Sequence, residues 1–351
     1  MIDKIYAKTM IIILVTLFLA IAFWSFYLTD NHPQAQYFYF GFGIILLIIV
    51  AFRGEGVDKD YLNYKDEFLS NSEIPFIIEP SFIFLKWIVR TYLNSNIFIF
   101  FFAYAILGIG LKMYAIKQLS KHLLASLLIY MSYSFILHDM TQIRASVAVG
   151  FFLLSIKPLQ ERNGIKFIVF SSLAIAFHFS AAILPLVWFL NPNKINVKTY
   201  LIAIVASYIL SAYSSTIVSK LFDYAPEGPL QLKLLAYEDD NSGILNVYNV
   251  WQLMRCALSV LFLLKIDFLK RQSEYAVLLV KIYVISACSF VILSNNPALA
   301  GRTSDMFSIV DIVIVPCLIT LVTPKIASKL IVIFIGFSYL ILNLFYNKII
   351  S

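Results

Sequence analysis

Apolar runs of about 17 to 25 residues, the length that an α-helix needs to cross a bilayer, recur along the whole of this chain. Only helices and closed barrels satisfy their backbone hydrogen bonds inside lipid, and runs of this length favour helices. We therefore predict membrane spans near residues 9–27, 36–52, 96–111, 123–138, 140–156, 199–219, 249–265, 275–294, 304–322 and 330–347.

Composition points to the same class of protein. Hydrophobic residues make up 61% of the sequence and charged residues 13%, whereas soluble domains hold about 45–50% and about 25%. The predicted fold class is an all-α polytopic membrane protein with about 10–12 transmembrane helices. We expect a single integral membrane domain over residues 1–351, in which the N-terminal run is retained because it lacks a small-residue cleavage motif.

Two apolar segments do not fit a simple crossing helix. Residues 80–93 are short and carry Lys86 and Arg90 opposite aromatic side chains, which favours a helix lying in the membrane interface. Residues 165–190 are apolar throughout but are interrupted by His178 midway, with Pro185 following. Because cationic loops flank this second segment on both sides, we predict a re-entrant pair of half-helices with His178 near the apex.

Orientation follows from the lysines and arginines of the short loops, which favour the cytoplasmic side. Such loops are marked by Lys112, Lys117 and Lys121, by Lys157, Arg162 and Lys166, by Lys194 and Lys198, by Lys265, Lys270 and Arg271, and by Lys325 and Lys329. The loops 53–95 and 220–248 are then predicted on the external side of the membrane, as is the N-terminus. The loop 220–248 is acidic. If residues 80–93 cross the membrane instead, the first loop and the N-terminus are predicted on the cytoplasmic side.

The net charge of +7 is explained by these loop lysines. No basic patch with interleaved aromatic residues indicates a nucleic-acid partner. Cys256, Cys288 and Cys317 all lie in apolar runs, and no CxxC pair or Cys/His cluster predicts a zinc or redox site. We predict no cofactor.

The first long polar stretch, Phe52–Pro80, places Tyr61 and Tyr64 among several carboxylates. Flat apolar rings and hydrogen-bond acceptors suit a sugar, and Arg53 at the start of the stretch suits a phosphate. The alternative is a solvated loop between two membrane helices. Asp58 and Asp60 also have the spacing of a metal-holding aspartate pair, but no partner ligands are evident, so no metal site is predicted.

Several polar residues of other segments are predicted on the same external face. One predicted turn holds His138, Asp139, Gln142 and Arg144. The others are His178, at the apex of the half-helix pair 165–190, and Arg302 with Asp305. Arg255 and Asp311 lie inside predicted spans, where burying an ionisable group costs free energy. They either have a functional role or form a structural ion pair with each other. Taken alone, a residue such as His178 is more often a hydrogen-bonded core histidine than a catalytic base.

Three arginines near one water-facing pocket suit a lipid-linked diphosphate sugar. Cations hold the diphosphate and offset its charge as it leaves. A carboxylate or a histidine takes the proton of the attacking sugar hydroxyl.

Five motifs occur in a fixed order: FRGEGVDKDYLNY, EPSFIFLKWIV, QIRASVAVGFFLLS, FHFSAAILPL and GRTSDMF. Together, over residues 53–307, they resemble the EpsG-like branch of the Wzy polysaccharide polymerases. The resemblance implies a multi-pass inner-membrane glycosyltransferase with a GT-C-like fold. It implies transfer of a glycan from undecaprenyl diphosphate to the non-reducing end of another lipid-linked repeat unit, on the periplasmic or outer face.

The resemblance also maps onto single residues. The arginine that opens the first loop is Arg53, the QxR arginine is Arg144 with Gln142 before it, and the late external arginine is Arg302. The remaining matches are Asp60, Tyr61 and Tyr64 of the DY…Y element, Glu79 and Pro80, and His178 of FHxSA. Ser81 stands where glycine is commoner, a departure that affects the local turn.

We therefore predict an O-antigen, capsule or exopolysaccharide polymerase. Arg144 and Arg302, assisted by Arg53, would hold diphosphate; Tyr61, Tyr64 and Gln142 would contact sugar. Asp60 or His178 would be the base, with Glu79 as the alternative. The expected partners are an undecaprenyl-diphosphate-linked oligosaccharide, the lipid bilayer and a chain-length-regulating co-polymerase. A flippase or transporter of lipid-linked sugars and an O-antigen ligase are the alternatives; a transporter typically shows matched broken helices in its two halves, and only the segment near His178 is broken here.

Overall fold

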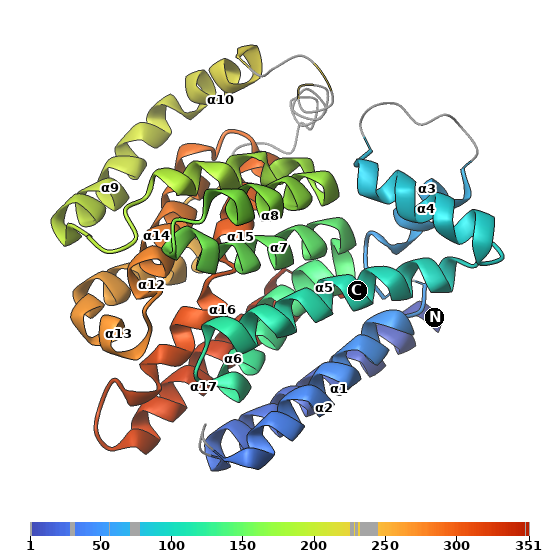
Figure 1. Ribbon diagram of the computed structural model, residues 1–351, viewed down its shortest axis with the longest axis horizontal. Helices are drawn as coiled ribbons and strands as arrows, with labels where there is room; N and C mark the ends of the chain where they lie inside the picture. Colours follow the sequence, from blue (N-terminus) through green and yellow to red (C-terminus); the bar gives the residue numbers. More distant parts are fainter. Residues whose placement is uncertain are drawn as a thin grey trace. The chain divides into compact units, whose positions relative to one another are not determined.

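The computed structural model in Figure 1 describes residues 2–28, 32–55, 57–70, 78–224, 228, 231, 245–347 and 349–350. All regular secondary structure elements in these described residues are helices. One isolated β-bridge joins Asp58 to Ile350. Eight of the described helices are long and apolar enough to cross a membrane: Tyr6–Tyr27, Pro33–Ala51, Ile97–Leu119, Leu123–Thr141, Ile143–Gln160, Val197–Asp223, Pro297–Thr320 and Lys325–Tyr346.

These helices confirm an all-α polytopic membrane protein. Four further apolar helices are shorter: Gly164–Phe177, Phe179–Phe189, Val250–Leu264 and Ala276–Ile292. Two of them coincide with the spans predicted near 249–265 and 275–294, and the other two make up the segment predicted as half-helices.

The chain divides into two compact units, which are described separately. Unit 1 comprises residues 1–72, 81–154 and 312–351, and unit 2 comprises residues 73–80 and 155–311. A single domain over residues 1–351 therefore remains a prediction.

Unit 1 is built from the N-terminal helices and the C-terminal hairpin. Its elements are α1 (Ile2–Tyr27), α2 (Pro33–Ala51), α3 (Tyr61–Leu69), α4 (Pro80–Tyr92), α5 (Ile97–Leu119), α6 (Leu123–Tyr130), the π-helix Met131–Thr141, the first part of α7 (Ile143–Gln160), α16 (Asp311–Ile314), the 3₁₀ helix Val315–Thr320, α17 (Lys325–Ile341) and the π-helix Leu342–Tyr346. In Figure 1 the blue helices α1 and α2 lie side by side, and they pack on α6 and α5 respectively.

Glycines allow helix α5 to approach its neighbours closely. A Cβ atom on Gly108 would lie 2.1 Å from the Ser146 Oγ atom of α7, and one on Gly150 of α7 would lie 2.8 Å from the Cβ atom of Leu111. Small residues at such contacts let helix backbones approach in lipid, where no hydrophobic force drives association. The close α5–α7 crossing therefore depends on these two positions.

Unit 2 holds the remaining helices. They are α8 (Gly164–Phe177), the 3₁₀ helices Phe179–Phe189 and Ser211–Tyr213, α9 (Val197–Leu210), α10 (Ser214–Asp223), α12 (Val250–Leu264), α13 (Ile266–Gln272), α14 (Ala276–Ile292) and α15 (Pro297–Ser308). Helix α14 packs against α15, α9 and α12. An asparagine side chain accepts a backbone N–H at the start of four of these helices, which fixes where each begins; the caps are Asn163, Asn196, Asn249 and Asn296.

The predicted pair of half-helices is confirmed as a broken helix hairpin. Helix α8 ends at Phe177 and the 3₁₀ helix begins at Phe179, with His178 in an extended conformation between them. At the open end, Arg162 donates hydrogen bonds to the carbonyl oxygens of Trp188 and Leu190. The two ends of the hairpin are thus held together, and His178 lies at its apex.

Helix α4, Pro80–Tyr92, occupies the segment predicted as an interfacial helix, and its place relative to a bilayer remains a prediction. The predicted loop 53–95 therefore contains two helices, α3 and α4. Of the predicted loop 220–248, only residues 220–224, 228, 231 and 245–248 are described. The acidic residues Glu227, Glu238, Asp239 and Asp240, with Glu73 of the first loop, lie outside the described residues.

Candidate functional site

Arg53 forms a buried ion pair at the start of the first polar stretch. Its Nε atom lies 2.9 Å from the Oδ2 atom of Asp58, and the two side chains are 1% and 0% exposed. Its Nη1 atom donates to the Val50 carbonyl oxygen at 3.1 Å. Burial raises the pKa of the Asp58 carboxyl above its usual value, and the charge of Arg53 acts in the opposite direction. The pair ties the loop to the end of α2.

Aromatic rings enclose the guanidinium of Arg53. Its Cζ atom lies 4.6 Å from the ring centroid of Phe101 and 5.8 Å from that of Tyr61, and these two rings stack at 4.8 Å. Cation–π contacts of this kind stabilise a desolvated cation. In this conformation Arg53 is engaged inside the protein, and its predicted role toward a diphosphate remains a prediction.

Asp60 follows directly, half-buried at the start of α3. Its backbone N–H donates to the Oδ1 atom of Asp58 at 3.0 Å, so the Arg53–Asp58 pair also sets the position of Asp60. A carboxylate at a helix N-terminus is favoured by the helix dipole. Among the described residues, no group of three or more His, Cys, Asp and Glu side chains gathers as a metal site would require.

Arg144 lies at the centre of the second cluster of unit 1. Its Cζ atom lies 5.1 Å from the ring centroids of both Tyr64 and Phe82, and the two rings lie 6.4 Å apart. Its Nη2 atom lies 3.4 Å from both carboxylate oxygens of Glu67. The structure thus brings Arg144 of α7, Tyr64 and Glu67 of α3 and Phe82 of α4 into one cluster, which we call the Arg144 cluster.

Helix α4 fixes the end of α3 that carries Glu67. Lys86 donates to the carbonyl oxygens of Glu67 and Ser70 at 2.7 and 2.8 Å, and Arg90 donates to that of Ser70 at 3.1 Å. Cations at a helix C-terminus satisfy its orphan carbonyls. Burial, and then the charge of Arg90, lowers the pKa of Lys86 from its usual value. These hydrogen bonds join the C-terminal end of α3 to α4, the two short helices that carry Tyr64, Glu67 and Phe82 of the Arg144 cluster.

A buried ionic network is formed around Asp139, which precedes Arg144 by five residues. The Nζ atom of Lys112 lies 2.9 and 3.0 Å from the two carboxylate oxygens of Asp139 and 2.8 Å from Ser146 Oγ. Tyr130 donates to the same carboxylate at 2.8 Å. Lys112 was predicted in a cytoplasmic loop and Asp139 in an external turn. That placement of Lys112 is wrong, because it lies inside α5 and its charge is neutralised there.

The other polar residues of this turn are also described. His138 is buried in the π-helix, with its Nδ1 atom 3.1 Å from Ser134 Oγ. Gln142 is half-buried between the π-helix and α7, and its backbone N–H donates to the Leu137 carbonyl oxygen. Its predicted contact with sugar remains a prediction.

In unit 2, His178 contacts Glu79. The Nδ1 atom of His178 lies 3.1 Å from the Glu79 Oε1 atom, and the Glu79 side chain is 0% exposed. Two of the candidate bases therefore form one pair. A carboxylate beside Nδ1 favours the tautomer that carries its proton on this nitrogen.

Arg255 forms the second polar centre of unit 2. It donates to Ser304 Oγ at 2.6 Å and to Asp305 Oδ1 at 3.1 Å. Asp305 is thus a carboxylate partner of Arg255, while Asp311 is buried. Arg302 lies half-buried on α15, three residues before Asp305.

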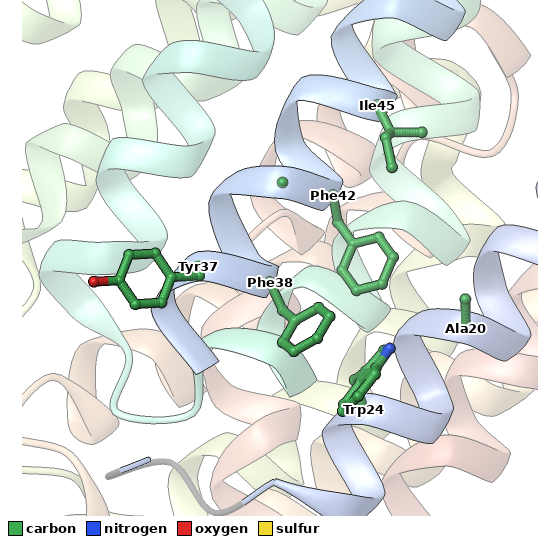
Figure 2. Close-up of a pocket in the computed structure, with 7 residues that line it drawn as sticks. Ala20, Trp24, Tyr37, Phe38, Phe42 and Ile45 are labelled. Atoms are coloured by element: carbon green, nitrogen blue, oxygen red, sulfur yellow. The ribbon is translucent and has the colours of Figure 1, made fainter. Parts of the chain in front are cut away.

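An apolar pocket of about 380 Å³ lies between α1 and α2 in unit 1. Figure 2 shows the rings of Trp24, Phe38 and Phe42 side by side along it, and Trp24 stacks on Phe38 at 3.9 Å. The side chains around it are hydrophobic or aromatic, so it lacks the charged groups that hold a diphosphate.

Sequence reasoning counted Glu67 only among the carboxylates of the first polar stretch. It did not name Ser304 and did not pair Lys112 with Asp139. For Glu67 a local signal existed, since Tyr64 and Glu67 are three residues apart and share one face of a helix. Its partner Arg144 is 77 residues away, and no local pattern indicates that contact.

Comparison with known proteins identifies a family model that matches this chain. The model of the EpsG family matches residues 36–350. Searches of curated proteins and of solved structures return no match. The match supports a polysaccharide polymerase-type function in general and confirms the resemblance that the five motifs indicated. Because it spans most of the sequence, the chain belongs to the EpsG family.

Proposed function

We propose that this protein is an oligosaccharide repeat-unit polymerase, a glycosyltransferase that uses undecaprenyl-diphosphate-linked substrates. The observation that carries the proposal is the Arg144 cluster. A guanidinium with a loosely held carboxylate and two neighbouring rings offers what a diphosphate-linked sugar needs. The cluster belongs to the segments that carry the family motifs, within the matched residues 36–350.

The reaction joins two lipid-linked chains. A hydroxyl at the non-reducing end of the acceptor attacks the anomeric carbon of the donor glycan, forming a new C–O bond. The bond from that carbon to the diphosphate oxygen breaks, undecaprenyl diphosphate leaves, and a base takes the hydroxyl proton. Catalysis requires cations at the leaving group and a base at the attacking one.

We assign Arg144 to the donor diphosphate, with Arg302 and Arg53 as further cations on the basis of the family motifs. Tyr64 of the Arg144 cluster, with Tyr61 and Gln142, is proposed to contact sugar. His178 is the proposed base. Its Nδ1 contact with Glu79 supports a role for Glu79 in orienting it, as carboxylates orient histidines in catalytic triads. Asp60 is the alternative base.

The proposed setting is the bacterial inner membrane, with chemistry on the periplasmic or outer face and a GT-C-like arrangement of helices. The product is O-antigen, capsule or exopolysaccharide. A chain-length-regulating co-polymerase is the proposed protein partner.

Intermediates in cells distinguish this function from its alternatives. In a host that lacks the chain, loss of a polymerase leaves single repeat units on the carrier at the outer leaflet. Loss of a flippase leaves them at the inner leaflet, and loss of a ligase leaves long polymer on the carrier. Single units outside, with polymer restored by the wild-type chain, support the proposal; either other pattern contradicts it.

A further inference from the structure

Two arginines of unit 1 hold their carboxylates in different ways. Arg53 and Asp58 meet at 2.9 Å with both side chains shielded from solvent. Arg144 and Glu67 meet at 3.4 Å, and their side chains are 13% and 31% exposed. Charge-assisted N–H···O bonds are normally about 2.7–2.9 Å long. The first pair is short and buried, whereas the second is longer and partly exposed.

Glu67 is held close to Arg144 by its backbone rather than by a strong side-chain bond. Lys86 binds the Glu67 carbonyl oxygen at 2.7 Å, so the last turn of α3 is fixed on α4. The carboxylate itself is held less firmly, since both of its oxygens lie 3.4 Å from the Nη2 atom of Arg144 and the side chain is partly exposed. A long, partly exposed ion pair contributes little to stability, so the protein loses little when this carboxylate turns away from Arg144.

We propose that Glu67 is an internal anion that occupies Arg144 when no substrate is bound, and that the diphosphate of the lipid-linked donor displaces it. The inference rests on the proposed role of Arg144. A diphosphate carries more negative charge and more acceptor oxygens than one carboxylate, so it wins this competition where a singly charged ligand does not. Glu67 thereby sets the selectivity of the cluster for polyanionic head groups.

Tyr64 and Phe82 keep Arg144 in place during this exchange. Both rings lie within cation–π distance of the guanidinium. These contacts favour the same position of the guanidinium whichever anion it binds.

Inorganic pyrophosphate is a suitable probe, because it carries the diphosphate without lipid or sugar. Its affinity is measured by calorimetry on the purified full chain in nanodiscs, for wild type, Glu67→Gln and the control Asp66→Asn. Asp66→Asn removes one negative charge from the exposed neighbouring position of α3. It therefore measures how much the affinity changes through net charge alone, without loss of the Glu67–Arg144 contact. We expect Glu67→Gln to bind pyrophosphate about two- to fivefold more tightly than the control does, the range of a partly exposed ion pair.

A second background makes the test specific to Arg144. In Arg144→Gln, the additional Glu67→Gln substitution should leave pyrophosphate affinity unchanged. Equal affinity of Glu67→Gln and Asp66→Asn overturns the proposal, as does an equal gain in the Arg144→Gln background. Loss of chain extension by Glu67→Gln with unchanged pyrophosphate affinity also overturns it. Tighter pyrophosphate binding by a protein that makes no polymer keeps this inference and refutes the polymerase assignment instead.

Discussion

The Nδ1 atom of His178 lies 3.1 Å from Oε1 of Glu79, although 99 residues separate them in the sequence. One residue is the apex of the broken hairpin and the other directly precedes α4. Their contact joins the histidine of the FHFSAAILPL motif to the first residue of the EPSFIFLKWIV motif, and it favours the tautomer of the proposed base that carries its proton on Nδ1.

Substitution at this pair tests the proposed base. His178→Gln should lower the rate of chain extension about 100-fold or more, which is the usual contribution of a general base. Glu79→Gln should also lower it, because the neutral amide no longer fixes the tautomer or stabilises the protonated ring. His32→Gln, at an exposed position before α2, is the control and should retain activity. Polymer of normal length from His178→Gln would leave Asp60 as the base.

Arg144 should be indispensable for chain extension. Alanine at this position removes the proposed diphosphate ligand, and lysine keeps the charge but loses the planar, multiply donating head group. We expect no polymer from Arg144→Ala and at least a roughly tenfold loss from Arg144→Lys, measured as polymer length in cells at matched protein levels. Arg271→Ala, an exposed arginine of α13, should behave as wild type. An active Arg144→Ala would remove Arg144 from the site.

The Lys112–Asp139 network should act on stability. Lys112→Met leaves the Asp139 carboxylate buried and uncompensated, which typically costs about 3–5 kcal/mol. The double substitution Lys112→Met with Asp139→Asn should recover part of this loss. Lys117→Met, on the exposed side of α5, provides the control. The measurement is the midpoint of thermal unfolding of each protein in detergent. Equal midpoints for Lys112→Met and Lys117→Met would refute the network's role.

Two glycines of α5 offer a matched pair. Gly108→Ala places a methyl group against Ser146 Oγ, beside the Lys112–Asp139 pair, whereas the same change at Gly110 meets nothing within 4 Å. We expect Gly108→Ala to lower stability by about 1–3 kcal/mol through overpacking. Gly110→Ala should be neutral or slightly stabilising because alanine favours helices. Similar thermal unfolding of both variants would show that the α5–α7 contact is looser than described.

The sequence predicted the helix hairpin around His178 because a polar residue and flanking cations interrupt an apolar run. Its partner Glu79 was named as a candidate but not as a neighbour, since no local rule relates residues so far apart. The placement of Lys112 failed for a physical reason. Counting loop cations assumes that a lysine near the end of a span faces water, and Lys112 instead finds a carboxylate inside the protein.

The first polar stretch illustrates the same limit. Tyr61 and Tyr64 were expected to face sugar, and the structure places each beside an arginine: Tyr61 beside Arg53 and Tyr64 beside Arg144. Residue types indicated a sugar- and phosphate-binding chemistry. Which arginine is fully buried and which is partly exposed depends on tertiary packing.

The most direct test is reconstitution. The purified chain in nanodiscs is supplied with undecaprenyl-diphosphate-linked repeat units from its own host, and the products are separated by gel or mass spectrometry. A ladder of products that each differ by one repeat unit, formed without other proteins, is the predicted result. No ladder, together with movement of the lipid-linked unit between leaflets when the same protein is placed in vesicles, would contradict the polymerase and identify a flippase.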